Sequence, residues 1–510
     1  RYSAYNFVSG VLGLIGAYLT IRYAPLPLYV RLLLPFTYYL CYQYAVIARS
    51  YALIAPLLFT IAALYPRSTR LPWLMTLLLD LLAAVSVHGF LLSACIWVTL
   101  YGPALVTPER KKLLAAGLTY WCILVILLVC AWPAKDVTFA AHRGLANLRL
   151  LPEVTAAGLA GAFAGQWIFS LILIALSIPF LWRGGGLLVF LISSAALCLF
   201  GSIVYAQLWH FGILFLVWIF AMWISAQKIR VTRPALVALL AAIAVQCYWT
   251  ASTIRYDWGH AYSGSRATAE YLHRTGLPPG GLYAIGYSSD AVQPYFDRNI
   301  YSDYHGAAYW DWSARNTAGD PAALVASDRR ELVLVGYKSN SERQQWADLL
   351  QLLGYSPAPH FEGATFWQTR VFEPESYDLY RRTSAPRLTG ATPLAGFYAS
   401  EGTTRWTAKD FSILLPAEPG EALVLHFFVP DIQIQHLGVI SLTADVNGRA
   451  LPAMTFPRSG EYTYSAPLSA AGTIVVNFHL DKASVGLNGD ARELGVIVSE
   501  VGSSPPSLAR

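Results

Sequence analysis

The chain has 510 residues, of which 55% are hydrophobic and only 13% are charged, and its formal net charge is +6. Because a soluble protein carries roughly a quarter charged residues, this composition excludes an ordinary soluble globular protein and requires membrane segments. The basic residues stand at the ends of apolar segments rather than in one patch, so nucleic-acid binding has no support in the sequence.

The acidic residues divide the chain into two parts. Only Asp80, Glu109, Asp136 and Glu153 precede Asp257, whereas the other 26 of the 30 acidic residues lie from Asp257 onward. All six cysteines fall in the first part, so no disulfide framework is expected in the second. We therefore expect a helical membrane domain over residues 1–257, followed by a water-soluble region.

The membrane domain is expected to contain about ten spans, with an uncertainty of two, since a spanning helix needs about 20 apolar residues. The chain starts at Arg1 almost inside the first apolar segment, with no initiating methionine and no signal peptide. We therefore expect a fragment that lacks N-terminal spans and the first outer loop. The predicted spans are 4–21, 28–44, 50–65, 71–87, 89–106, 113–132, 155–181, 186–204, 211–226 and 234–251.

The loops between these spans differ in basic charge. One alternating set holds eleven basic residues, at positions 22, 31, 67, 70, 110–112, 183, 228, 230 and 233. The opposite set holds Arg49, Lys135, Arg143 and Arg149. Because basic loops favour the cytoplasm, the opposite set and the region after Asp257 are expected outside. The predicted location is the bacterial inner (plasma) membrane, with a periplasmic or extracellular C-terminal region.

The soluble region is expected to form two domains. Over residues 258–382, helical and strand patterns alternate, and the buried run 331–336 reads as a strand, which indicates a small α/β domain. Over residues 390–510, apolar runs are separated by Pro-Gly, Asn-Gly and Ser-Gly turns, which indicates an antiparallel, jelly-roll-like β-sandwich. A stretch rich in Pro, Thr and Ser joins the two domains.

Five polar residues on the predicted outer side are candidates for binding a phosphate or pyrophosphate head group, because polar groups at membrane depth are costly and tend to be functional. Arg49 lies in an apolar hairpin, where its guanidinium could grip a phosphate through paired donors or could be an interface anchor. His88, His142, Arg143 and His210 would complete a cationic rim. Each histidine could instead be a packing or capping residue.

An aromatic cluster in the soluble region is a candidate sugar-binding surface. Tyr304, Trp310 and Trp312 are interleaved with Asp303 and Asp311, and aromatic faces beside carboxylates suit a pyranose. The same residues could form an ordinary aromatic core or a surface that docks on the membrane. No residue cluster has the spacing of a metal cage, so no metal ligand is assigned, and whether a divalent metal ion assists stays open.

Several motifs in this order resemble the GT-C superfamily, the multispan glycosyltransferases that use polyprenyl-phosphate sugars and include aminoarabinose transferases and protein O-mannosyltransferases. The resemblance covers roughly residues 1–250, and the C-terminal region is similar to the β-sandwich appended to some bacterial members. The helical motifs are Ala48-Arg49-Ser50-Tyr51, Ser86-Val-His-Gly89 and Trp209-His-Phe-Gly-Ile-Leu-Phe215, and the C-terminal ones include Gly396-Phe-Tyr, Arg405-Trp406, Val446-Asn-Gly and Asp490-Ala-Arg-Glu-Leu-Gly495.

The resemblance implies an inverting transfer of a sugar from a polyprenyl-phosphate donor to an envelope glycan, lipid or protein. In that family an aspartate of the first outer loop is the general base. That loop is expected to precede Arg1, so no catalytic residue is assigned in this sequence. The resemblance also makes Arg49 the first candidate for the donor phosphate, with His88 and His210 second.

A non-enzymatic membrane scaffold or transporter for envelope polysaccharide, with glycan-binding outer domains, is the alternative. A transporter is expected to show repeated halves and broken helices at mid-membrane, and neither is evident from the sequence. The donor sugar, the acceptor, the lipid length and the oligomeric state stay open.

Overall fold

The computed structural model describes residues 2–102, 110–132, 145–277, 281–301, 331–337, 339–384, 388–446, 448–485 and 492–505. By packing, the chain divides into two compact units. The first contains the described residues up to His260 together with Phe366–Val371, and the second contains the remaining described residues. Five of the predicted site residues lie outside the described residues: His142, Arg143, Tyr304, Trp310 and Trp312.

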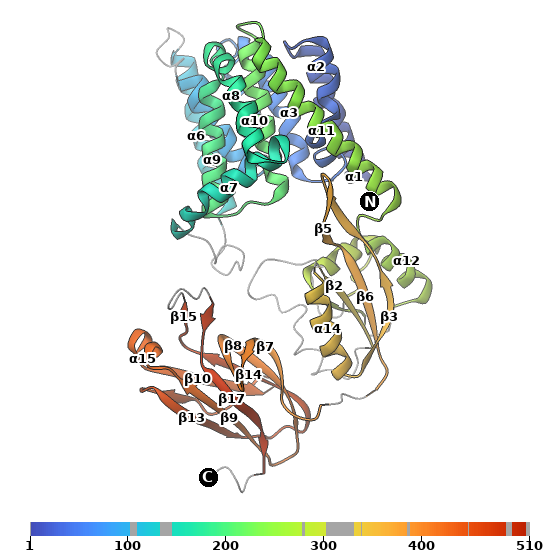
Figure 1. Ribbon diagram of the computed structural model, residues 1–510, viewed down its shortest axis with the longest axis vertical. Coiled ribbons are helices and arrows are strands. Elements are labelled where there is room, and N and C mark those ends of the chain that lie inside the picture. The colour runs from blue at the N-terminus through green and yellow to red at the C-terminus, as the bar shows by residue number, and fades with distance from the viewer. Residues whose placement is uncertain are drawn as a thin grey trace. The chain divides into compact units, whose positions relative to one another are not determined.

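The first unit is a helical bundle (Figure 1). Six helices among the described residues are long and apolar enough to cross a membrane, which confirms the helical, membrane-type N-terminal region. These are α1 (Tyr2–Tyr23), α3 (Ile54–Leu64) with its flanking turns η3 (Ser50–Leu53) and η4 (Tyr65–Arg67), α6 (Arg110–Ala131), α8 (Trp167–Gly184), α10 (Leu208–Ala226) and α11 (Arg233–Gly259). Three shorter apolar helices accompany them: α4 (Pro72–Val85), α5 (Val87–Ile96) continued by η5 (Trp97–Tyr101), and α9 (Leu187–Ile203).

Two of the predicted spans are interrupted rather than continuous. The segment 28–44 consists of α2 (Leu28–Leu33), η1 (Leu34–Phe36) and the π-helical η2 (Tyr38–Gln43), with an extended Thr37 before η2. The segment 155–181 is divided between α7 (Leu151–Leu159), the π-helical η9 (Ala160–Ala164) and α8, because Gly165 takes a φ of 74°. The short helix η8 (Leu145–Leu150) precedes α7. Segment 28–44 is thus interrupted, as its shortness allowed, whereas nothing in the sequence indicated the break within 155–181.

Side chains of α11 satisfy backbone carbonyls at both interruptions. Gln246 Nε2 donates to the carbonyl of Ala162 at 2.7 Å, and Thr250 Oγ1 donates to the carbonyl of Phe36 at 2.8 Å. Irregular backbone at membrane depth is tolerated only where protein groups replace the missing helical hydrogen bonds. The polar residues of α11 thus explain how an apolar bundle accommodates two broken helices.

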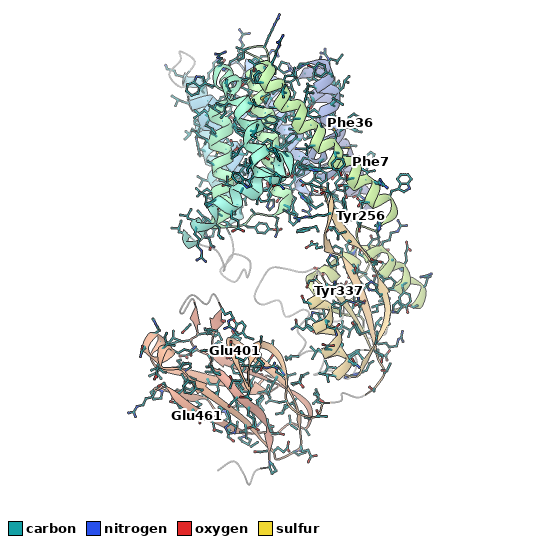
Figure 2. All side chains as sticks on the ribbon, in the orientation of Figure 1. Phe7, Phe36, Tyr256, Tyr337, Glu401 and Glu461 are labelled. Atoms are coloured by element: carbon teal, nitrogen blue, oxygen red, sulfur yellow. The ribbon has the colours of Figure 1, made fainter. Side chains whose placement is uncertain are left out.

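Helix α10 is the centre of the bundle, and the outer helices carry the exposed apolar residues. Trp218 and Trp223 of α10 are fully buried, in keeping with a helix that is apolar on all sides. By contrast, Phe7 is 72% exposed and Phe36 is 60% exposed, and Figure 2 shows both on the outside of the bundle. Such large exposed aromatic side chains suit a lipid surrounding.

The described basic loops gather at one end of the bundle. The turn at residues 25–27 and the α10–α11 loop at 226–231 line the same groove. Lys228 Nζ lies 5.8 Å from the ring centroid of Tyr65, which is beside Arg67. Three of the predicted basic loops therefore lie close together, and the alternation of the loops and the side of the membrane on which each end lies stay predictions.

The second unit begins with a four-stranded sheet in the order β1-β2-β6-β3, with β1 and β2 parallel and the other pairs antiparallel. Ala269 and Leu272 of one helix, α12, pack on one face, and Leu349 and Leu350 of another, α14, pack on the other. The elements are α12 (Ser265–Thr275), β1 (Tyr283–Ile285), η10 (Tyr287–Tyr295), β2 (Leu332–Tyr337), α14 (Asn340–Leu352), β3 (Tyr355–Phe361) and β6 (Ser376–Arg382). Between β3 and β6 lies a hairpin of β4 (Ala364–Trp367) and β5 (Arg370–Pro374).

The C-terminal region is an antiparallel two-layer arrangement, which confirms that this part of the chain is strand-rich. Strand β8 is shared by both layers, because Trp406 pairs with β17 and residues 410–417 pair with β14. Alternate residues of both layers form one apolar core. The elements are β7 (Thr392–Glu401), β8 (Thr404–Ala417), β9 (Ala422–Val429), α15 (Asp431–Leu437), β10 (Ile440–Val446), β11 (Arg449–Ala450), β12 (Met454–Phe456), β13 (Gly460–Pro467), β14 (Gly472–Leu480), β15 (Ser484–Val485), β16 (Glu493–Leu494) and β17 (Ile497–Ser504).

Candidate functional site

Two histidines from distant parts of the sequence stack on each other at one end of the bundle. His88 lies in the first turn of α5, whose N-cap Ser86 accepts a hydrogen bond from the backbone N–H of Gly89 at 3.1 Å. His210 lies in the first turn of α10, after the cap residue Gln207. The two imidazole rings have centroids 4.0 Å apart and an interplanar angle of 30°, and both residues are buried.

The helix cap of α10 determines which nitrogen of His210 carries the proton. The backbone N–H of Gln207 donates to His210 Nδ1 at 3.0 Å, so Nδ1 is an acceptor and a neutral ring carries its proton on Nε2. His210 Nε2 lies 2.9 Å from Tyr51 Oη and is therefore the donor in that contact. Tyr51 accepts with its oxygen, which leaves its own hydroxyl proton available for another acceptor.

Arg49 lies beside this histidine pair. Its Cζ is 4.2 Å from the ring centroid of Trp209, the residue before His210, so the guanidinium stacks on the indole. The backbone carbonyl of Trp209 accepts a hydrogen bond from Tyr44 Oη at 2.6 Å, which fixes this turn. Among the described residues Arg49 has no ion pair.

The structure thus brings Arg49, His88 and His210 together with Tyr51 and Trp209. We call these five residues the histidine cluster. The sequence prediction did not include Tyr51 as a site residue, although it belongs to the Ala48-Arg49-Ser50-Tyr51 motif. Two features of the sequence could have indicated Tyr51 as a site residue: the nearby Arg49 and the tyrosine-rich segment before it. Whether the cluster binds a substrate stays a prediction.

A small cavity of about 20 Å³ adjoins the histidine cluster. Such a volume holds one water molecule and excludes a sugar or a phosphate. Arg49 and Tyr51 do not line this cavity and are only half-buried. The cavity is lined by His88, Val154, Leu197, Cys198, Ala206, His210, Phe211 and Leu214.

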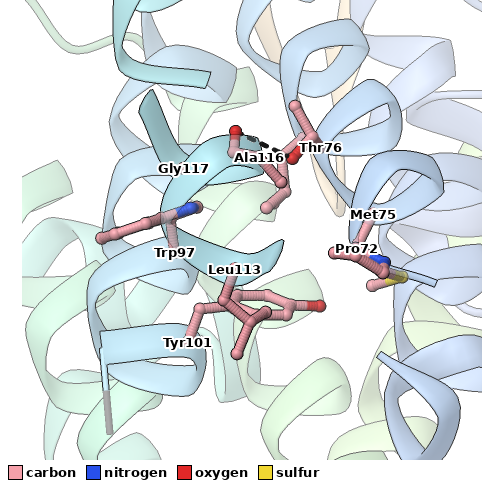
Figure 3. Close-up of a pocket in the computed structure, with 9 residues that line it drawn as sticks. Pro72, Met75, Thr76, Trp97, Tyr101, Leu113, Ala116 and Gly117 are labelled. Atoms are coloured by element: carbon pink, nitrogen blue, oxygen red, sulfur yellow. Dashed lines mark hydrogen bonds between the residues drawn. The ribbon is translucent and has the colours of Figure 1, made fainter. Parts of the chain in front are cut away.

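A second cavity, of about 10 Å³, lies between α4, η5 and α6 (Figure 3). Its lining is mostly apolar, and the one polar contact drawn there is satisfied, since Thr76 Oγ1 donates to the carbonyl of Ala116 at 3.3 Å. No charged side chain of the described residues lines this cavity. As for metals, the described part of the chain has no group of three or more His, Cys, Asp or Glu side chains that could hold an ion.

The comparisons with known proteins are sparse. No family model matches the chain. No curated protein matches it either. Among solved structures, a mutant of the arabinofuranosyltransferase AftD from Mycobacteria matches with a TM-score of 0.25 and 12% identity. The match covers 98% of this chain, which spans about half (54%) of that protein. A distant structural neighbour is thus a glycosyltransferase, at a TM-score too low to establish a shared fold.

Proposed function

We propose that this chain is part of a membrane glycosyltransferase of the GT-C type, which takes a sugar from a polyprenyl-phosphate donor. The observation that carries the proposal is the histidine cluster, in which Arg49, Tyr51 and two histidines meet at the end of an apolar bundle. A lipid-linked phosphate needs both of these surroundings: an apolar surface for the chain and hydrogen-bond donors for the head group.

The donors of the cluster match the chemistry of a phosphate diester. The Arg49 guanidinium can offer two parallel N–H groups, and Tyr51 can add its free hydroxyl proton. In the proposed inverting transfer, a general base takes the proton of an acceptor hydroxyl, whose oxygen forms the new bond to the anomeric carbon while the bond from that carbon to the phosphate oxygen breaks. The polyprenyl phosphate leaves with the extra negative charge, which Arg49 stabilises. No catalytic base is assigned within this chain.

The wider assignment follows from the same proposal. The chain would lie in the bacterial inner membrane, and its second unit would face the periplasm or the outside, where an envelope glycan, lipid or protein is the acceptor. Residues Tyr304, Trp310 and Trp312 remain candidate sugar contacts, and His142 and Arg143 remain candidate phosphate contacts. A divalent metal ion, if one takes part, would need ligands beyond those described here.

The alternative function, a scaffold or transporter for envelope polysaccharide, has one observation in its favour. The interrupted segments 28–44 and 155–181 are the kind of broken helix that transporters use at their binding sites. The two proposals differ in their product. In detergent solution a transferase still forms a new glycosidic bond. A transporter forms no such bond, and in detergent it has no compartments between which to move its substrate.

The direct test uses the complete protein, a radiolabelled polyprenyl-phosphate sugar and membrane acceptors. Arg49→Ala is expected to abolish transfer of the label while leaving the amount of folded protein unchanged. Arg149→Ala is the matched control, because Arg149 is exposed and belongs to the same set of loops. Turnover by the Arg49→Ala variant at the normal rate would remove Arg49 from the site.

A further inference from the structure

The tip of the β4–β5 hairpin is buried in the helical bundle, although most of the sequence around it belongs to the second unit. Residues Phe366–Val371 belong to the helical unit. Trp367 is 8% exposed and is part of the apolar core of the bundle. Its ring lies edge-on to two tyrosines of η2, with centroid distances of 5.4 Å to Tyr38 and 6.3 Å to Tyr39.

The next residue, Gln368, is held in an unfavourable backbone conformation. It has a φ of 58° and is the one non-glycine residue with a positive φ in the described part of the chain. Glutamine rarely adopts this left-handed conformation, since its Cβ crowds the following carbonyl oxygen. Such a conformation persists only where the surroundings determine it, and it is often associated with function.

The Gln368 side chain closes the break in the helix at η9. Its Nε2 donates to the carbonyl of Gly161 at 2.9 Å, and its own backbone carbonyl accepts from Thr253 Oγ1 at 3.5 Å. The carbonyl of Gly161 also accepts from Tyr39 Oη at 2.8 Å. One carbonyl of the interrupted helix is therefore shared by a hairpin residue and a residue of η2.

Tyr39 connects this shared carbonyl to the start of α10. A Cβ added at Gly212 would lie 2.1 Å from Tyr39 Cδ1 and 2.6 Å from Tyr44 Oη, so both tyrosines pack directly on the helix backbone. Tyr44 Oη also donates to the carbonyl of Trp209. The turn held in this way carries Trp209, on which Arg49 stacks, and His210.

We propose that Trp367 and Gln368 are positioning residues for the histidine cluster. They hold η9 and Tyr39 in place, and through Tyr39 and Tyr44 they fix the first turn of α10. Glycine would adopt this backbone conformation without strain, but it would lack the amide with which Gln368 donates to the carbonyl of Gly161. The proposal rests on the proposed function in one respect, namely that the histidine cluster binds a phosphate.

The test compares variants of the full chain in lipid nanodiscs by hydrogen exchange and by binding of polyprenyl phosphate. Gln368→Met keeps the length of the side chain and removes the donor, and Trp367→Ala removes the buried ring. Arg370→Ala is the control, because Arg370 is an exposed residue of the same hairpin. Exchange of the α4 backbone reports whether the whole bundle has loosened.

We expect Gln368→Met to speed exchange in the peptides covering 158–164 and 207–212 about fivefold, the factor that loss of one hydrogen bond gives. Trp367→Ala should have a larger effect at the same sites, with exchange in α4 unchanged and with Arg370→Ala equal to the wild type. The affinity for polyprenyl phosphate should fall by a similar factor in both hairpin variants.

Unchanged exchange at 207–212 in both hairpin variants would overturn the inference, as would equal acceleration throughout the bundle. If the wild type itself does not bind polyprenyl phosphate, the proposed function fails, and hydrogen exchange alone decides whether the hairpin positions the first turn of α10.

Discussion

The hydroxyl proton of Tyr51 is made available by a chain of hydrogen bonds that starts at the backbone of Gln207. Because Gln207 N–H occupies His210 Nδ1, the proton of His210 lies on Nε2 and is given to Tyr51 Oη. The His210 side chain thus takes part both in the cap of α10 and in the proposed ligand site. A residue at position 207 without a backbone N–H, such as proline, could not donate to His210 Nδ1. The ring could then turn, and Tyr51 would use its own proton in the contact with His210.

Replacing Tyr51 by phenylalanine should therefore weaken binding of polyprenyl phosphate about tenfold, because a hydrogen bond to a charged group is worth about 1.5–3 kcal/mol. Titration of the purified protein with the lipid measures this. Tyr18→Phe is the matched control, since Tyr18 is an exposed residue of α1. Equal affinities of Tyr51→Phe and the wild type would show that the hydroxyl does not face the ligand.

At the scale of the elements, α10 depends on close contact between a helix backbone and two tyrosine side chains. Gly212 allows this contact, because its missing side chain leaves room for Tyr39 and Tyr44. Gly10 in α1 has no atom within 4 Å of an added Cβ. The two glycines are thus a matched pair, one required for packing and one free of packing demands.

Gly212→Ala is expected to destabilise the bundle by about 1–3 kcal/mol, the usual effect of overpacking, and to lower the affinity for polyprenyl phosphate. Gly10→Ala should be neutral or slightly stabilising, since alanine is the better helix former. Thermal unfolding in detergent measures both variants. A Gly212→Ala variant as stable as Gly10→Ala would contradict the packing described here.

The elements that depend on local pattern could be predicted from the sequence, and those that depend on distant contacts could not. Strand β9 is one of the apolar runs between turns that the sequence indicates over 390–510, because its apolar residues and flanking turns are local signals. The break at Gly165 was missed, since an apolar stretch gives no sign that Gln246 and Gln368 will cap it from afar. Likewise, the sequence indicated a cationic rim that includes Arg49, His88 and His210, but the contact of His210 with Tyr51 required the tertiary structure.

At the scale of the whole molecule, the two units use different means of stabilisation. The helical unit relies on apolar packing, whereas the sheet β1-β2-β6-β3 contains a buried ionic group. Asp378, which is 5% exposed, accepts from Arg343 Nε at 2.7 Å and pairs with His360 Nδ1 at 2.6 Å. The hydrogen bond to Asp378 raises the pKa of Arg343 above its usual value, so Arg343 keeps its positive charge.

Asp378→Ala is therefore expected to destabilise the second unit by about 2 kcal/mol, a value reduced from that of a fully buried pair because Arg343 is partly exposed. Binding of polyprenyl phosphate should be unchanged, since the histidine cluster belongs to the other unit. Separate thermal transitions and a lipid titration test this expectation. A loss of lipid binding at full stability would contradict the assignment of the site to the helical unit.

The measurement that tests the central claim most directly is a binding comparison between polyprenyl phosphate and the polyprenol of the same chain length. Both lipids offer the same apolar chain, so the difference in their affinities isolates the contribution of the phosphate. If the histidine cluster binds the head group, the wild type prefers the phosphate form by at least about tenfold, and Arg49→Ala abolishes the preference. Equal affinity of the wild type for the two lipids would contradict the account.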